Sequence, residues 1–412
     1  MTHALETHTP DPQAPGPQAP DPQAPDLQAP DPQVPGLQAP DLQAPDLQAP
    51  GPQVPGPQVT GSQVTGPQAF DPQALDPQGS GSRAPGPEAS DPQALDSLAA
   101  RGSGHPEWIW RDGALVPWEQ ATVHVNAVGH ASVAAVFEGI KAYLAADGRR
   151  LLAFRLDDHL RRLFESARLC RLDLPGDVDD LREAILGLLR ANACRTDTYI
   201  RPWAFPRGVI REQMVPAGTR CEIVVDSWPF HSHLLTPRGC RAAVSSWIRV
   251  SDASMPPRAK TFSNYHNGRL AMMEARENGH DWPILLNDRH KVSEGPGACV
   301  ALVRDGTVIT PSLTSGLLAG LTRDSVCALT AGLGLALEER EVDRSELYLA
   351  DEVFFMGTAW EILPVTTVDG RRVGDGTMGP VTARLEREYA AIVRGRSERH
   401  PEWLTEIPLD PG

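Results

Sequence analysis

Residues 259–265 read AKTFSNY and residues 293–297 read SEGPG, and these two segments decide how the rest of the chain is interpreted. A single lysine or glutamate is usually a solvated surface charge. Here Lys260 precedes an Asn-Tyr pair at the start of an expected helix, and glycines on either side of Glu294 let the backbone approach a ligand closely. We therefore predict that Lys260, Tyr265 and Glu294 serve one ligand site.

Pyridoxal phosphate is a ligand that needs this set of groups. Its aldehyde condenses with an amine, its ring nitrogen must be kept protonated by an acid, and its phosphate requires cationic and backbone donors. We expect Lys260 to hold the cofactor as a Schiff base and Glu294 to make a charge-assisted hydrogen bond to the ring nitrogen. Tyr265 is expected to bond the ring hydroxyl.

Two segments are candidates for binding the phosphate. Residues 320–325, GLTRDS, place Thr322 as the N-cap of a helix whose first N–H groups point at an anion, although capping alone explains the string as well. Arg162 is the second candidate, because guanidinium binds phosphate oxygens through a fork of donors. Further arginines share its segment, so position alone does not select it.

Two more segments are candidates for binding the substrate. In the strand expected over residues 198–205, Tyr199 and Arg201 share one face, where a phenol beside a guanidinium suits the distal carboxylate of an acidic substrate. A structural ion pair of Arg201 is the alternative. The turn Gly357-Thr358-Ala359 offers N–H groups and a hydroxyl to a substrate α-carboxylate, and an ordinary turn explains it equally well.

The first part of the chain has a different composition. Residues 11–96 repeat a five-residue unit rich in proline, glutamine and alanine, too short a period for a packed solenoid and unlike the Gly-X-Y period of collagen. The first 100 residues hold 12 acidic side chains and one basic one, Arg83, and so carry −11 of the formal net charge of −15. We predict that residues 1–104 are disordered with local polyproline II character.

The charge, the cysteines and the apolar runs of the chain limit the partners and the location that we expect. A nearly balanced charge outside the tail gives no reason to expect nucleic acid or a membrane as a partner. The six cysteines show no CxxC pair or zinc-site spacing, so we expect buried free thiols and no metal site. No apolar run approaches 18 residues and no signal segment is recognisable, which predicts a cytoplasmic protein.

From residue 107 onward, helices and strands mix without strict βαβ alternation, which indicates two α+β domains. We predict a small α/β domain over residues 105–230, a linker over 231–239 and a large cofactor-binding domain over 240–412. Expected elements are hairpins turning at Asp112-Gly113, Asp305-Gly306 and Asp369-Gly370, short strands at 123–125, a helix N-capped by Asp157 or Asp158, and helices over 179–191, 265–278, 323–331 and 381–394.

The folded part resembles the class IV, or fold-type IV, pyridoxal phosphate aminotransferases, most closely the branched-chain amino acid aminotransferases, a D-amino acid aminotransferase-like α+β fold. The matching strings occur in order across nearly all of the folded part. They are VFEGI at 136–140, YIRP at 199–202, AK at 259–260 with NY at 264–265, SEGPG at 293–297, LTRD at 321–324, YLADEV at 348–353 and GTA at 357–359 with EI at 361–362.

The resemblance implies a role for each candidate residue. Lys260 would be the Schiff-base lysine and proton carrier, Glu294 the partner of the ring nitrogen and Tyr265 the partner of the ring hydroxyl. It also implies a homodimer at least, with the active site between the two domains. The phosphate would be bound by Arg162, Leu321, Thr322 and Thr358, the α-carboxylate by Thr358 and Ala359, and the substrate side chain by Phe137, Tyr199 and Arg201.

Three departures from the family pattern concern the substrate. Residues 131–133, ASV, stand where many relatives have His-Tyr-Gly, so Ser132 removes bulk and an aromatic hydroxyl from the pocket. Residues 298–299, AC, stand where Glu-Asn is frequent. Trp360 replaces a small residue after Gly-Thr-Ala and is expected to add bulk near the substrate. The cofactor chemistry is expected to be intact.

The resemblance implies transamination of leucine, isoleucine and valine with 2-oxoglutarate, giving branched-chain 2-oxo acids and L-glutamate. One alternative is a class IV relative acting on a D-amino acid, aminodeoxychorismate or an unusual amino acid of a specialised pathway, which Ser132 keeps open. Another is an inert aminotransferase-like body whose proline-rich tail binds partners, although the tail has no regular PxxP with flanking arginines. The tail is equally explained as a spacer or as an upstream extension from a misassigned start.

Overall fold

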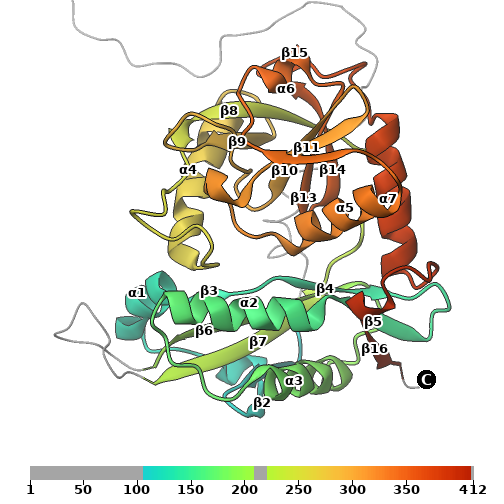
Figure 1. The fold of residues 1–412 in the computed structure, drawn as a ribbon. Coiled ribbons are helices and arrows are strands. Elements are labelled where there is room, and N and C mark those ends of the chain that lie inside the picture. Colours follow the sequence, from blue (N-terminus) through green and yellow to red (C-terminus); the bar gives the residue numbers. More distant parts are fainter. Residues whose placement is uncertain (1–104, 208–219, 410–412) are drawn as a thin grey trace, which may run out of the picture. The chain divides into compact units, whose positions relative to one another are not determined.

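A computed structural model describes residues 105–207 and 220–409 of the chain, and the tail predicted over residues 1–104 lies outside the described residues. Two eight-stranded sheets form the framework of this part (Figure 1). The described helices are α1 (Val125–Ala134), α2 (Leu156–Leu169), α3 (Val178–Ala191), α4 (Phe262–Glu277), α5 (Leu321–Gly332), α6 (Glu346–Leu349) and α7 (Pro380–Val393), with short 3₁₀ turns at Trp118–Gln120, Leu313–Ser315 and Pro401–Trp403.

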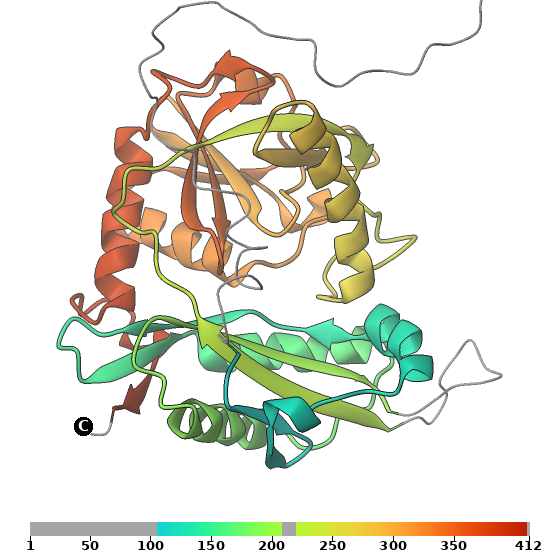
Figure 2. The ribbon, with the colours of Figure 1, turned by 180° about the vertical axis from the view of Figure 1, so that it is seen from behind.

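The first sheet is antiparallel throughout. Its strands are β1 (Trp108–Arg111), β2 (Ala114–Pro117), β3 (Val136–Phe137), β4 (Ile140–Leu144), β5 (Arg150–Phe154), β6 (Thr198–Pro206), β7 (Cys221–Pro229) and β16 (Leu404–Pro408). They lie in the order β16-β5-β4-β6-β7-β1-β2, with β3 paired to β6. Helices α2 and α3 lie together on one face of this sheet (Figures 1 and 2).

The second sheet is mixed. Its strands are β8 (Cys240–Ile248), β9 (Trp282–Leu286), β10 (Cys299–Arg304), β11 (Thr307–Pro311), β12 (Leu337–Arg340), β13 (Glu352–Gly357), β14 (Glu361–Val368) and β15 (Arg371–Arg372). They lie in the order β12-β11-β10-β13-β14-β8-β9, with β15 paired to β14. The pairs β11–β12, β14–β8 and β8–β9 are parallel.

Local sequence explains the turns and the helix faces. All three predicted Asp-Gly hairpins form, and both residues of each turn have positive φ, the conformation that two-residue type I′ turns require. In α2, apolar side chains recur every three or four residues and pack into the core against the first sheet. Asp177 and Asp180 form a capping box at the start of α3.

Four local predictions were wrong. The segment predicted as short strands at 123–125 leads into α1, whose N-cap is His124. Helix α2 begins after Arg155, a residue with φ of 51° that makes no side-chain cap bond, so neither aspartate caps it. Helix α4 begins earlier than predicted, at Phe262. The chain also returns from α7 to the first sheet as β16, which pairs with β5, so the predicted large domain does not extend to residue 412.

Candidate active site

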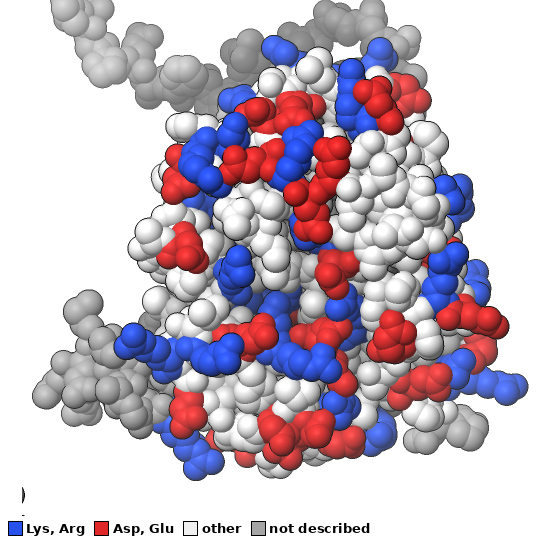
Figure 3. Space-filling view, in the orientation of Figure 1, with Lys and Arg blue, Asp and Glu red and all other residues white. Residues whose placement is uncertain are grey.

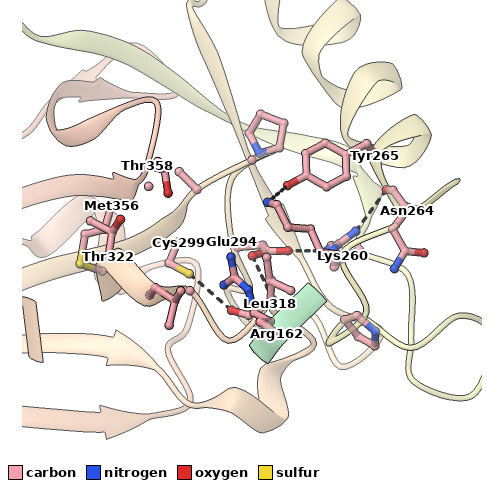
Figure 4. A pocket seen from close by; sticks show the side chains of 18 of the residues that line it. Arg162, Lys260, Asn264, Tyr265, Glu294, Cys299, Leu318, Thr322, Met356 and Thr358 are labelled. Carbon is pink, nitrogen blue, oxygen red and sulfur yellow. Dashed lines mark hydrogen bonds and ion pairs between the residues drawn. The ribbon is translucent and has the colours of Figure 1, made fainter. Parts of the chain in front are cut away.

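The predicted cofactor residues line one pocket. Its walls come from α2, from the segment before α4, from the SEGPG turn, from the start of α5 and from the end of β13 (Figure 4). Every residue predicted to bind the cofactor lies in this lining: Arg162, Lys260, Tyr265, Glu294, Leu321, Thr322 and Thr358.

Lys260 is held from both sides by its backbone. Its N–H donates to the Ser166 hydroxyl oxygen on α2 at 3.0 Å, and its carbonyl accepts from the Phe137 N–H at 3.0 Å. The Thr261 hydroxyl caps α4 and places Tyr265 on the first turn of that helix. The ammonium of Lys260 then donates to the Tyr265 Oη at 2.7 Å, which brings the phenol next to the amine.

Lys260 also stands out among the lysines. The chain has only three, all of them described: Lys141, Lys260 and Lys291. Lys141 is buried in an ion pair with Glu361, and Lys291 pairs with Asp343. Among the ion pairs of the described residues, none includes Lys260, so its amine is the one that faces the pocket without a carboxylate partner. The low number of lysines was a signal in the sequence that limits the Schiff-base candidates to three.

Glu294 is buried at another wall of the pocket, with an exposed fraction of 5%. Its Oε1 accepts from the Arg249 Nε at 2.7 Å, and its Oε2 accepts from the Leu318 N–H at 3.2 Å. Burial raises the pKa of Glu294, while the positive charges of Arg249 and Lys260 oppose that rise. Arg249 was not predicted, because a single arginine after a strand carries no recognisable pattern.

The third wall of the pocket contains an open helix end. Helix α5 begins at Leu321 after the N-cap Gly320, and no side chain caps it. The predicted capping role of Thr322 was therefore wrong, since Thr322 is the second residue of the helix. The uncapped N–H groups and the helix dipole favour an anion there. A Cβ on Gly320 would lie 2.8 Å from the Cys299 Sγ, so glycine permits this close approach.

Arg162 reaches the pocket from α2 within a buried cluster that also holds Glu138 and His159. Its Nε and Nη2 donate to the two carboxylate oxygens of Glu138 at 2.7 and 2.8 Å, and its Nη1 donates to the Ala319 carbonyl at 2.6 Å. His159 contacts the same carboxylate at 2.7 Å. Burial alone would raise the pKa of Glu138, but Arg162 and His159 hold it well below its usual range.

The structure places the predicted substrate residues in different environments. Thr358 lines the pocket and Ala359 follows it in the turn after β13, outside the lining. The Phe137 ring lies 4.9 Å from the Tyr265 ring and 5.0 Å from the Lys260 ammonium. The Tyr199 hydroxyl reaches over Gly139, because a Cβ on that glycine would overlap the phenol oxygen.

Arg201 and Trp360 are engaged elsewhere. Arg201 forms a structural ion pair, the alternative considered for it from the sequence. Its Nη2 donates to the Asp226 Oδ2 at 2.7 Å. The Trp360 ring packs on Trp282 at 4.0 Å and on Phe355 at 5.1 Å and is not in the pocket lining. The expectation that Trp360 adds bulk near the substrate was therefore wrong, because its partly buried ring packs against the core of the second sheet.

The donor set fits pyridoxal phosphate. An amine beside a phenol, a buried carboxylate and an uncapped helix end with an arginine meet the three demands of its aldehyde, ring nitrogen and phosphate. Asn264 adds a buried amide oxygen in the pocket lining that has no hydrogen-bond partner. Within residues 105–207 and 220–409, no group of three His, Cys, Asp or Glu side chains is placed to hold a metal ion.

Two findings concern the surface and membranes. On the face drawn in Figure 3, acidic and basic side chains are interspersed over the described residues. No helix in the described part of the chain has the length and apolar character needed to span a bilayer.

Comparison with known proteins covers most of the folded part. Residues 135–368 match the family model for amino-transferase class IV. The branched-chain-amino-acid aminotransferase of Escherichia coli strain K12 is 37% identical over 304 residues, which are 73% of this chain and 97% of that protein.

Solved structures of branched-chain aminotransferases are also similar to the folded part of this chain. The crystal structure of the branched-chain amino acid aminotransferase from Thermobaculum terrenum in its PLP form has a TM-score of 0.72 and 42% identity, covering 74% of this chain and 99% of that one. The branched-chain aminotransferase of the archaeon Thermoproteus uzoniensis, solved with norvaline, has a TM-score of 0.69 and 39% identity, with coverage of 73% and 99%.

Proposed function

The chain belongs to the class IV aminotransferases, and we propose that it is a pyridoxal phosphate-dependent transaminase of branched-chain L-amino acids. Leucine, isoleucine and valine donate their amino groups to 2-oxoglutarate, giving branched-chain 2-oxo acids and L-glutamate. The observation that carries the proposal is the placement of the Lys260 amine, the Glu294 carboxylate and the open end of α5 around one pocket. The names of the relatives support the choice of substrate.

Each wall of the pocket has a task in this proposal. When bound, pyridoxal phosphate supplies an electron sink that lets an amino acid lose its α-proton. Lys260 would hold the cofactor covalently until the substrate amine replaces it, and its freed Nζ would then carry that proton. Glu294 keeps the ring nitrogen protonated, and Tyr265, hydrogen-bonded to Lys260, bonds the ring hydroxyl. The phosphate is held by Arg162, Leu321, Thr322 and Thr358.

The substrate residues act at the other side of the pocket. The turn at Thr358 and Ala359 takes the α-carboxylate through its N–H groups. Phe137 provides an apolar wall beside Tyr265 for a branched side chain. Tyr199 and Arg201 lie on one face of β6. Arg201, held in place by its ion pair with Asp226, binds the distal carboxylate of 2-oxoglutarate or glutamate beside Tyr199 when that substrate occupies the pocket.

A panel of amino donors tests the choice of substrate. Native protein is incubated with 2-oxoglutarate and single L- or D-amino acids, and glutamate is measured. The proposal predicts the highest kcat/KM for L-leucine, L-isoleucine and L-valine. A preference for a D-amino acid, or release of pyruvate from aminodeoxychorismate, contradicts it.

We further propose that the protein is a homodimer. Three valines of α1 are largely exposed, Val125 by 76%, Val128 by 46% and Val133 by 64%, and α1 packs beside α4, which exposes Met273 by 56%. Exposed apolar side chains on a helix are what a subunit interface would cover. Light scattering of the full chain should give twice the mass of 44.5 kDa, and a monomer at micromolar concentration contradicts the proposal.

We place the enzyme in the cytoplasm. All six cysteines are free thiols, which suits a reducing compartment. Fractionation of the source cells should recover the activity with cytosolic markers, and recovery with an extracytoplasmic marker would contradict this location.

A further inference from the structure

Arg249 is a buried cation that contacts the carboxylate of Glu294. It follows β8 directly, lines the pocket and is 8% exposed. Its backbone N–H donates to the Leu286 carbonyl at 2.7 Å, which fixes the residue to the adjacent strand β9. Its Nε donates to the Glu294 Oε1 at 2.7 Å, and its Nη1 donates to the Asn264 carbonyl at 3.4 Å.

The carboxylate of Glu294 is consequently held at both oxygens by the protein. Arg249 binds Oε1 and the Leu318 N–H binds Oε2. Two anchored oxygens fix the plane of the carboxylate, while each oxygen keeps a lone pair for a further donor. The side chain cannot rotate away from the pocket without breaking a charge-assisted bond.

The charge of Arg249 also decides which form of Glu294 is present. Burial favours the neutral acid and raises the pKa of Glu294. Arg249 and Lys260 are the cations that oppose this effect, and the nearby Cys299 thiol is neutral because burial raises its pKa to about 12. Arg249 is the cation in contact with Glu294, and this contact does not depend on whether Lys260 anchors the cofactor.

We propose that Arg249 is a positioning residue that keeps Glu294 ionised and aimed into the pocket, so that the proton between Glu294 and the cofactor resides on the ring nitrogen. The proposal rests on the proposed function, in which Glu294 faces that nitrogen. Without Arg249, the buried carboxyl takes up a proton and the pair becomes a neutral acid beside a neutral ring. The electron sink is then weakened although the cofactor stays bound.

Spectroscopy of the holoenzyme tests this directly. Arg249→Met removes the charge at similar size, and Arg249→Lys retains it. We expect Arg249→Met to lower kcat by about 10- to 100-fold with less than about a threefold change in donor KM, since the lost interaction acts on the transition state. The pH dependence of the cofactor absorbance should shift in Arg249→Met and return toward native in Arg249→Lys.

A double-mutant cycle in the cofactor-free protein gives a second readout. Arg249→Met alone leaves Glu294 buried without its partner, so the midpoint of thermal unfolding should fall. Adding Glu294→Gln to Arg249→Met should lower the midpoint less than Glu294→Gln does in the native background. Arg394→Met, which breaks a partly buried ion pair with Asp197 that lies outside the pocket lining, measures the general cost of losing such a pair.

The outcomes separate this inference from the proposed function. Native protein that binds no pyridoxal phosphate overturns the proposed function and this inference with it. Native protein that binds the cofactor, with Arg249→Met keeping both the native absorbance titration and the native kcat, overturns the inference alone. Additive effects of Arg249→Met and Glu294→Gln on unfolding also overturn it.

Discussion

Lys141 and Glu361 form a fully buried ion pair, with 2.8 Å from Nζ to Oε1, that joins β4 of the first sheet to β14 of the second. Glu361 also accepts from the Ser232 hydroxyl at 2.7 Å and from the His233 N–H at 2.9 Å, so the linker between the sheets is tied to the same carboxylate. Glu361 has φ of 58° and follows the turn that carries Thr358. This pair therefore fixes the two sheets around the pocket.

Breaking the pair should destabilise the fold. Lys141→Met removes the shorter of the two cation contacts of the buried Glu361 carboxylate and leaves Arg238, whose Nη1 lies 3.5 Å from Oε2. We therefore expect the free energy of unfolding to fall by about 3 kcal/mol, the lower end for breaking a buried pair. Adding Glu361→Gln should recover part of that loss, because the buried charge that lost its closest partner is removed. Denaturant unfolding measures both. Lys291→Met, at the exposed pair with Asp343, is the control and should change stability little. A native-like Lys141→Met would contradict this account.

The cluster around Glu138 should make the fold sensitive to acid. Because the pKa of Glu138 lies below its ordinary 4.5, the group contributes stability above pH 4.5 that is lost as pH falls below it. Burial lowers the pKa of His159, which adds a loss of the same sign below its ordinary 6.5. Unfolding midpoints of native protein should therefore drop more steeply below pH 4.5 than those of Glu138→Gln. Parallel curves would contradict the role of Glu138.

Adding a methyl group at Gly320 should weaken cofactor binding. The Cβ of Gly320→Ala would lie 2.8 Å from the Cys299 Sγ and force the start of α5 to shift. We expect the dissociation constant of pyridoxal phosphate to rise at least about tenfold, corresponding to about 1.4 kcal/mol. Gly187→Ala is the matched control, because a Cβ there meets nothing within 4 Å on α3. Equal affinity of Gly320→Ala and native protein would contradict the prediction.

Trp360 should affect stability more than substrate choice. Its ring packs at an angle on Trp282 and edge-on against Phe355, so Trp360→Ala should lower the free energy of unfolding by about 2–3 kcal/mol, less than for a fully buried tryptophan. The ratio of kcat/KM values for leucine and valine should change less than about twofold. Competition assays with both donors measure this ratio. A large change in the ratio would contradict the prediction and indicate that Trp360 contacts the substrate.

Sequence patterns predicted the parts of the structure that local chemistry determines. The Asp-Gly hairpins followed from the φ angles those turns require, and most helices followed from the spacing of their apolar side chains. The residues expected at the cofactor lie around one pocket because their motifs combine glycine, lysine and glutamate in patterns that ordinary surface loops seldom show.

Long-range packing decided the rest. The pairing of β16 with β5 joins segments 250 positions apart and leaves no local signal. Arg249 belongs to no recognisable sequence motif, and its role follows only from its contact with Glu294, 45 positions later. The prediction for Trp360 was wrong because the side chain of a turn residue next to a pocket can point to either side. Its ring instead packs on the apolar surface of Trp282.

Reductive trapping tests the central claim that Lys260 holds the cofactor. Native protein loaded with pyridoxal phosphate is reduced with borohydride, and the modified peptide is identified by mass spectrometry. With only three lysines in the chain, the measurement has few outcomes. The account predicts a phosphopyridoxyl group on Lys260 and no modification of Lys260→Ala. Modification of Lys141 or Lys291, or none in the native protein, would contradict it.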